Sequence, residues 1–147
     1  MNSRGWIVRN QIIWHKPNAM PQSVRDRFVN DYEVLFMFTK QKRYKFNIQK
    51  ENVTGKERLK RAVWSINTKP QNFGHIAPYP QELIETCILS STDEGDIVLD
   101  PFIGSGTTGV VATLFNRNFI GFELNGNYSS IAKERIENTY NELIESK

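Results

Sequence analysis

The sequence of 147 residues predicts an α/β fold, and three observations support this prediction. The stretch DIVLDPFIGSGTTGVVATLFNRNFIGFE at 96–123 combines a short aliphatic run, a glycine-rich turn, a helical segment and a second apolar run. Two longer apolar runs, at 5–14 and 32–39, have the composition of strands. From residue 128 onward, apolar residues recur at helical spacing. Strands that alternate with helices favour a partly parallel sheet with helices against it.

The composition is that of an ordinary globular domain, with 39% hydrophobic and 24% charged residues. No stretch reaches the ~18 apolar residues of a membrane span, and the first ten residues lack the apolar core of a signal peptide. We therefore expect a cytoplasmic protein with no membrane partner. A lone cysteine, Cys87, and two separated histidines, His15 and His75, predict neither a disulfide nor a metal site.

The runs at 5–14 and 32–39 are expected to pair as strands. The connection between them, His15 to Asp31, is longer than a tight hairpin turn, and loops of this length inside a compact domain are usually functional. Its side chains Arg25 and Arg27 are candidates for contacts with nucleic-acid phosphates, although a bland surface ion pair with Asp26 explains them equally well.

A basic segment follows at 40–61. It contains nine basic and two acidic residues, so that its charge is +7 and the rest of the chain carries −4. Interleaved aromatic residues make it a candidate phosphate-contacting surface, in particular at Lys42, Arg43 and Lys45. A solvated basic loop is the alternative. A short apolar run at 62–66 comes next.

An amphipathic helix is predicted from Gln81 to Leu89, because apolar residues recur at its positions three and four apart. Pro80 suits the start of this helix, and Cys87 is expected to be a small core residue on its apolar face.

The glycine-rich stretch predicts a ligand cradle. A strand at 97–99 ends at Asp100, and the glycine turn that follows allows a ligand to approach the backbone. Thr107 and Thr108 are expected to cap a helix that continues to Leu114. A second strand, at 118–122, leads to Glu123, which lies close to the ~20-residue interval at which nucleotide-binding units place a ribose-binding acid.

Two ligand classes suit this cradle. Gly104 to Gly109 has the GxGxxG spacing of dinucleotide sites, which on its own is a weak signal. Asp100 opposes that interpretation, because its carboxylate would repel a pyrophosphate and attract a cationic amine. S-Adenosylmethionine carries such an amine, a sulfonium and a ribose, but no phosphate.

DPFIGSGTT at 100–108 resembles the cofactor motif, and GFEL at 121–124 the ribose motif, of the amino-methylating (cytosine-N4 or adenine-N6) DNA methyltransferases that use S-adenosylmethionine. The stretches IIWHKPN, SVRDRF and YEVLFMFTK, between residues 12 and 40, resemble later catalytic-domain motifs of the beta-type members, and HIAPYPQEL at 75–83 resembles the motif that precedes the cofactor loop. The resemblance spans the whole chain but only the carboxyl-terminal half of the family. Residues 1–147 are therefore expected to be the carboxyl-terminal part of a catalytic domain, with a short basic recognition-like loop at about 40–61.

The resemblance implies roles for individual residues. Asp100 would lie near the methionine amine, Glu123 would accept hydrogen bonds from the ribose, and Leu124 would flank the adenine. The implied cofactor-binding residues are His75, Pro80, Asp100, Phe102, Gly104, Ser105, Gly106, Thr107, Glu123 and Leu124. The implied DNA-binding residues are Arg25, Arg27, Lys42, Arg43 and Lys45.

The family's catalytic motif is absent. It consists of Asp, Asn or Ser followed by Pro-Pro and an aromatic residue, whereas none of the six prolines here is adjacent to another. No catalytic residue is therefore expected in this chain. The fold expected from the resemblance is a partial Rossmann-like methyltransferase sheet with flanking helices, without the strands that lead to the catalytic motif. The strand at 97–99 would then expose an apolar edge, with the strands at 5–14 and 32–39 standing apart from it.

The function that the resemblance implies is site-specific methylation of cytosine N4 or adenine N6 in DNA, with restriction–modification or phage use as settings. The target base must be flipped out of the duplex, and HIAPYP slightly favours cytosine. The chain would be a fragment of an interrupted gene, one subunit of a split enzyme or a non-catalytic relative. Its expected partners are DNA and either a second polypeptide that carries the catalytic motif or further copies of the chain in a homo-oligomer. The alternatives are a non-enzymatic DNA-binding or cofactor-binding module and a nicotinamide-dependent oxidoreductase.

Overall fold

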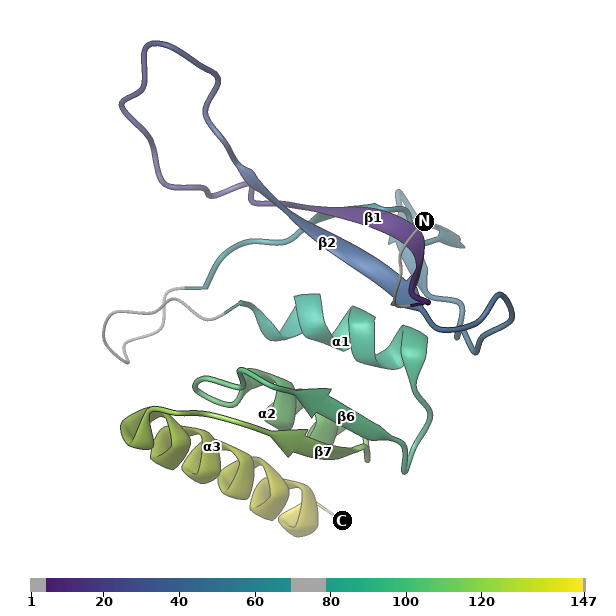
Figure 1. The fold of residues 1–147 in the computed structure, drawn as a ribbon, viewed down its shortest axis with the longest axis vertical. Helices are drawn as coiled ribbons and strands as arrows, with labels where there is room; N and C mark the ends of the chain where they lie inside the picture. The colour runs from purple at the N-terminus through teal and green to yellow at the C-terminus, as the bar shows by residue number, and fades with distance from the viewer. Residues whose placement is uncertain (1–4, 70–78, 147) are drawn as a thin grey trace. The chain divides into compact units, whose positions relative to one another are not determined.

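The computed structural model describes residues 5–69 and 79–146. The chain divides into two compact units, Met1–Thr68 and Lys69–Lys147. The first unit contains strands β1 to β5, and the second contains α1, β6, α2, β7 and α3 in that order (Figure 1). Among the described residues, no helix has the length and apolarity needed to cross a membrane.

The first unit is built on a three-stranded sheet with the order β2-β1-β5. Strand β1 (Ile7–His15) pairs antiparallel with β2 (Tyr32–Thr39), from Ile7 opposite Thr39 to His15 opposite Tyr32. The short strand β5 (Val63–Ser65) runs parallel to β1. The predicted pairing of the two long apolar runs is confirmed.

A two-stranded hairpin lies within the basic segment. Strands β3 (Lys50–Val53) and β4 (Lys56–Leu59) pair antiparallel around Thr54 and Gly55, which both have positive φ. Two such residues form the type I′ turn that matches the twist of a hairpin. The basic segment is thus partly ordered by its own backbone pairing.

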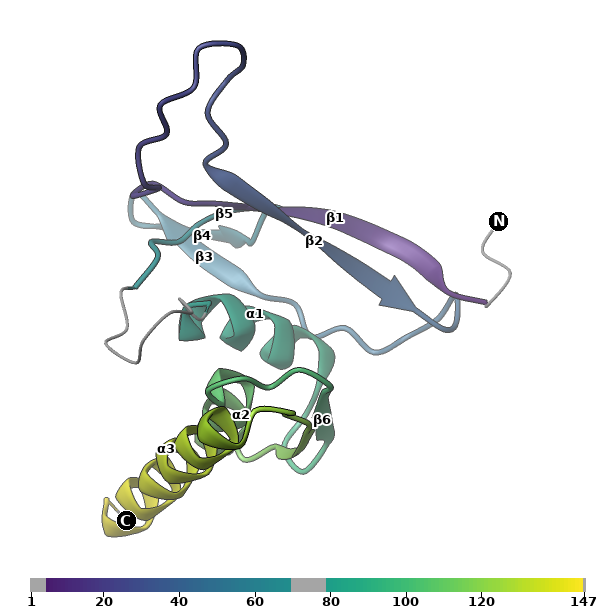
Figure 2. The same ribbon diagram turned by 60° about the vertical axis from the view of Figure 1, so that its left-hand side comes forward.

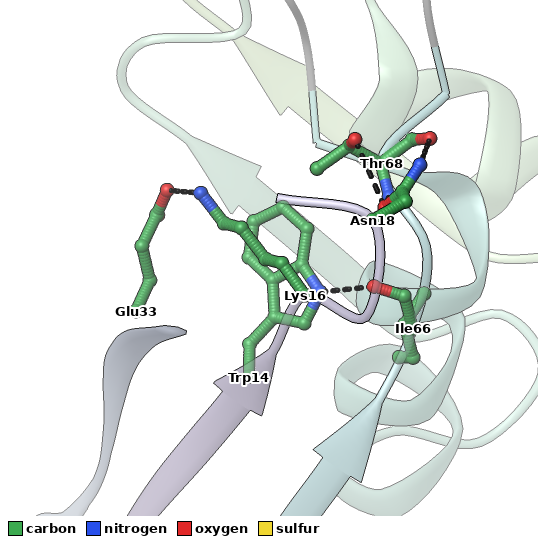
Figure 3. A network of polar contacts seen from close by, with 6 residues as sticks. All are labelled: Trp14, Lys16, Asn18, Glu33, Ile66 and Thr68. Carbon is green, nitrogen blue, oxygen red and sulfur yellow. Dashed lines mark hydrogen bonds and ion pairs between the residues drawn. The ribbon is translucent and has the colours of Figure 1, made fainter. Parts of the chain in front are cut away.

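The end of β1 is fixed by a network of polar contacts (Figure 3). The buried indole of Trp14 donates a hydrogen bond to the Ile66 carbonyl at 2.8 Å, and the Lys16 ammonium lies 4.6 Å from the centre of the same ring. The side chain of Asn18 donates to the Thr68 carbonyl at 2.9 Å and accepts from the Thr68 amide at 2.8 Å. The segment after β5 is therefore tied to the beginning of the long β1–β2 loop.

The described residues of the second unit form two parallel strands and three helices. Strand β6 (Ile97–Asp100) pairs with β7 (Asn118–Gly121), from Ile97 opposite Asn118 to Asp100 opposite Gly121. Helix α2 (Thr107–Leu114) contacts α1 (Gln81–Ser91), β7 and α3 (Gly126–Glu145), as Figure 2 shows for the helices. One cluster of the core consists of Ile88, Val111 and Ala112, with Ile84, Val98, Phe115 and Phe119 packed against it.

Several local expectations were wrong. Gly106, at φ +89°, occupies the N-cap of α2, so neither threonine caps the helix. The Thr107 hydroxyl is buried without a hydrogen bond to the described residues, and Thr108 bonds to Asp100. Helix α3 begins at Gly126, before the predicted Tyr128, because the side chain of Asn125 accepts N–H hydrogen bonds from residues two and three positions later. Cys87 is only half-buried.

The predicted apolar edge is present. In the described part of the chain, β6 pairs with β7 alone. Ile97 and Leu99 on β6 are 63% and 62% exposed. An apolar strand with unpaired backbone groups favours pairing with another segment.

Candidate functional site

The carboxyl ends of β6 and β7 bring two acidic residues to the same edge of the sheet. Asp100 ends β6 opposite Gly121, and the Phe122 amide donates to the Asp100 carbonyl at 3.0 Å. The chain returns after the turn, where the Ile103 amide donates to the Phe122 carbonyl at 3.0 Å. Glu123 follows directly, so both predicted acids lie where parallel α/β sheets bind their ligands.

The two glycines of the turn serve different purposes. At Gly104, with φ +55°, a side-chain Cβ would meet only the Phe102 carbonyl oxygen, 3.9 Å away, among the described residues, so none of them fills the space over this residue. At Gly106 a Cβ would lie 2.8 Å from Cα of Ala132, so α3 fills that space. Gly104 can therefore admit a ligand, whereas Gly106 allows α3 to approach the turn.

The carboxylate of Asp100 is held from two sides. Its Oδ1 accepts the Phe102 amide at 3.0 Å, and its Oδ2 accepts the Thr108 hydroxyl at 2.5 Å. The Tyr79 hydroxyl lies 3.1 Å from Oδ2 and 2.6 Å from the Thr108 hydroxyl oxygen. Burial raises the pKa of Tyr79 to about 12, so this hydroxyl keeps its proton at neutral pH.

Tyr79 is a site residue that sequence reasoning missed. It stands directly before Pro80, the buried N-cap residue of α1, and 21 positions before Asp100. No local pattern reports a hydrogen bond between residues so far apart in the sequence. The only available signal was the aromatic position inside HIAPYP.

Glu123 and the neighbouring apolar side chains form an open surface. Glu123 accepts the Asn125 amide at 2.8 Å, which orients its carboxylate at the beginning of α3. The side chains of Phe102 and Leu124 are 84% and 104% exposed. This surface therefore offers a carboxylate beside apolar area, which suits a ribose and a purine.

Two clefts flank these strand ends. One, of about 500 Å³, lies between α1 and β6 and includes Asp100, Tyr79 and Thr108 in its wall. The other, of about 360 Å³, lies between β7 and α3 and includes Glu123. Asp100 and Glu123 thus line different clefts at one end of the sheet.

The other predicted cofactor residues do not all face this end. The side chain and carbonyl of Ser105 accept hydrogen bonds from Arg135 of α3, at 2.9 and 2.6 Å, and burial lowers the pKa of that guanidinium. Thr107 is 2% exposed and points into the protein. His75 lies outside the described residues.

The candidate DNA-binding residues lie in two exposed segments of the first unit. In the β1–β2 loop, Arg27 contacts both carboxylate oxygens of Asp26 at 3.0 Å, while Arg25 has no partner among the described residues. After β2, the guanidinium of Arg9 lies 4.8 Å from the centre of the Tyr44 ring and donates to the carbonyls of Gln41 and Lys42. This contact braces a turn on which Lys42 and Arg43 are exposed. Lys45 is exposed in the same segment.

Much of the hairpin's charge is already paired. Lys50 contacts Glu57 at 2.7 Å, and Arg58 contacts Glu51 at 2.8 Å, in both cases across the two strands. The exposed cations Arg25, Lys42 and Arg43, which lie outside the hairpin, are therefore better placed for an external phosphate than Lys50 and Arg58.

Comparisons with known proteins identify relatives of this chain. A family model described as DNA methylase, of the N6/N4 class, matches residues 1–134. The Type II methyltransferase M.Cfr9I of Citrobacter freundii is 48% identical over 136 residues, which are 90% of this chain and 45% of that protein. The chain spans about half the length of the curated relatives it matches.

Solved structures give the same result. The crystal structure of an M1.HpyAVI–SAM complex matches with a TM-score of 0.73 and 34% identity, over 90% of this chain and 64% of that one. A DNA modification methylase of Thermus thermophilus, TTHA0409, complexed with S-adenosyl-L-methionine, matches with a TM-score of 0.63 and 30% identity, over 92% of this chain and 55% of that one. These matches confirm the predicted α/β, Rossmann-like architecture.

Proposed function

Because this chain belongs to the N6/N4 DNA methylase family, we propose that it is the cofactor-binding part of a site-specific DNA methyltransferase. The complete enzyme transfers a methyl group from S-adenosylmethionine to cytosine N4 or adenine N6. The observation that carries the proposal is the pair of acids, Asp100 and Glu123, at the ends of adjacent parallel strands beside the open turn at Gly104.

The residues at the carboxyl ends of β6 and β7 suit each part of the cofactor. The carboxylate of Asp100 would hold the cationic amine of the methionine moiety, and Glu123 would accept hydrogen bonds from the ribose hydroxyls. The exposed Phe102 and Leu124 would cover the adenine. When bound, S-adenosylmethionine supplies the electrophilic methyl group. Pro80 and His75 belong to the proposed site through the family motif alone.

A dinucleotide fits the site at the carboxyl ends of β6 and β7 less well. Asp100 would repel a pyrophosphate, and Arg135, whose guanidinium reaches the glycine turn, is already bonded to Ser105. A nicotinamide-dependent oxidoreductase is therefore not favoured.

The target amino group must be held by a segment that this sequence lacks, since its six prolines include no adjacent pair. We place the docking site of that segment along the free edge of β6, where Ile97 and Leu99 are exposed beside the cleft of about 500 Å³. A second polypeptide would supply it, because a second copy of this chain lacks the same segment. The same lack supports a non-catalytic, cofactor-binding relative as the second candidate.

DNA is the proposed macromolecular substrate. Arg25, Arg27, Lys42, Arg43 and Lys45 would contact its phosphates, because they are exposed on two segments of one unit. Such contacts position a duplex without selecting its sequence.

Calorimetric titration of the folded chain with S-adenosylhomocysteine tests the proposal. Asp100→Asn and Glu123→Gln are each expected to weaken binding by ~10-fold or more, because a hydrogen bond to a charged group contributes ~1.5–3 kcal/mol. Glu94→Gln, before the opposite end of β6, is the matched control and is expected to bind as the unaltered chain does. A folded chain that binds NADH but not S-adenosylhomocysteine would contradict the proposal.

A further inference from the structure

The three hydroxyl and carboxylate oxygens at Tyr79, Thr108 and Asp100 form a closed triangle. Tyr79 precedes α1, Thr108 lies in the first turn of α2, and Asp100 ends β6, so the triangle joins three elements of the second unit. All three residues are partly or fully shielded from solvent. Water therefore does not readily compete for these hydrogen bonds.

The direction of the hydrogen bonds follows from counting protons. An ionised carboxylate only accepts, so the Thr108 hydroxyl must donate its single proton across the 2.5 Å contact to Oδ2. Thr108 can then only accept from Tyr79, whose oxygen lies nearer to Thr108, at 2.6 Å, than to Asp100, at 3.1 Å. The shorter chain of donation runs from Tyr79 to Thr108 to Asp100, and the Tyr79 hydroxyl also lies within hydrogen-bond distance of Oδ2 itself.

Two properties make Tyr79 a dependable donor. Burial raises its pKa to about 12, so it remains protonated over the physiological range. Its hydroxyl also fixes the orientation of the Thr108 hydroxyl, because Thr108 accepts a hydrogen bond from Tyr79 and must donate its own proton toward Asp100. With the Phe102 amide on Oδ1, both oxygens of Asp100 are then oriented, and at least one acceptor direction is left for a ligand.

We propose that Tyr79 is a positioning residue of the cofactor site, which acts through Thr108 to aim the Asp100 carboxylate at the amine of the methionine moiety. This inference rests on the proposed function. Tyr79 itself need not touch the cofactor. Its effect is therefore confined to ligands that carry the amine.

The test compares two ligands that differ in the amino-acid end. S-Adenosylhomocysteine carries the amine and its carboxylate, whereas 5′-methylthioadenosine keeps the adenosine and the sulfur and has only a methyl group in place of that end. Tyr79→Phe keeps the ring packing and removes only the hydroxyl. We expect it to weaken S-adenosylhomocysteine binding by ~10-fold and to leave methylthioadenosine binding unchanged. Tyr140→Phe, an exposed tyrosine on α3, is the matched control and is expected to change neither affinity.

Two further variants keep the test decisive. Thr108→Val is expected to show the same ligand selectivity, since it breaks the donation chain one step later. Adding Tyr79→Phe to Asp100→Asn is expected to cost nothing more, as two changes acting through one interaction are not additive.

The outcomes distinguish a failure of this inference from a failure of the proposed function. An equal loss for both ligands would mean that Tyr79 only supports the fold, and no loss for either would mean that Asp100 is aimed without it; each overturns the inference alone. If the unaltered chain binds neither ligand, the proposed function fails and the inference fails with it.

Discussion

At the scale of single residues, the glycine turn separates packing from binding. Gly106→Ala would place a Cβ 2.8 Å from the backbone of Ala132, at a φ of +89°. Within the part of the chain that the structure describes, Gly104→Ala would meet only one atom, at 3.9 Å, although its φ of +55° still carries strain. Backbone strain of this kind costs ~1–3 kcal/mol, and a forced clash with another helix adds to it.

We therefore expect Gly106→Ala to lower the free energy of unfolding by more than ~3 kcal/mol, and Gly104→Ala by ~1 kcal/mol. Gly104→Ala is expected instead to weaken S-adenosylhomocysteine binding, because its new methyl group stands where the ligand approaches. Urea unfolding followed by circular dichroism measures the first effect, and calorimetry the second. A Gly104→Ala chain that is destabilised as strongly as Gly106→Ala would show that the space over Gly104 is not open.

At the scale of elements, the cations of the first unit differ in whether they are already paired. Lys42 and Arg43 are exposed on the turn after β2, whereas Arg58 contacts Glu51 across the hairpin at 2.8 Å. Each phosphate contact that is lost should lower the salt dependence of DNA binding by about one unit of slope.

Lys42→Ala and Arg43→Ala are each expected to reduce that slope by about one, whereas Arg58→Ala is expected to change it little. Fluorescence anisotropy of labelled duplex DNA at several salt concentrations gives the slopes. If none of the three variants changed the slope, the DNA-contacting surface would lie elsewhere.

The elements also show what the sequence could reveal. Strands β1, β2, β6 and β7 and helix α1 were predictable because each carries an apolar pattern of the right period. The hairpin of β3 and β4 was not predicted, because KENV and KERL are mostly charged and are held by backbone pairing and cross-strand ion pairs. The cap of α2 was misassigned because Gly106 accepts a left-handed φ that threonine resists.

The residues of the candidate site divide in the same way, into those that a local sequence pattern predicts and those that it does not. Asp100, Gly104 and Glu123 follow from a strand, turn and helix pattern that is local in the sequence. Tyr79 does not, because its role depends on tertiary contacts to Asp100 and Thr108. The placement of Ser105 and Thr107 toward α3 and the interior likewise depends on how α3 packs, which no local pattern specifies.

At the scale of the whole molecule, each unit exposes apolar surface that a complete α/β sheet would cover. In the first unit, Val34, Phe36 and Phe38 alternate along β2 and are all exposed on one face. In the second, Ile97 and Leu99 lie on the free edge of β6. The chain spans about half the length of its relatives, and a polypeptide that corresponds to the other half of that length is the occupant that we propose for these surfaces.

We expect the chain to bind a polypeptide that corresponds to the part of M.Cfr9I it lacks, and methyl transfer to DNA to appear only in the mixture. Ile97→Asp with Leu99→Asp should abolish both association and transfer, because charges on the edge of a strand oppose pairing. Ile144→Asp, at an exposed position of helix α3, is the matched control and should do neither. Sedimentation velocity measures the association, and incorporation of labelled methyl groups measures the transfer. Transfer by the chain alone would show that the docking surface is not needed, and a mixture that associates equally well with the aspartate variant would move the interface away from β6.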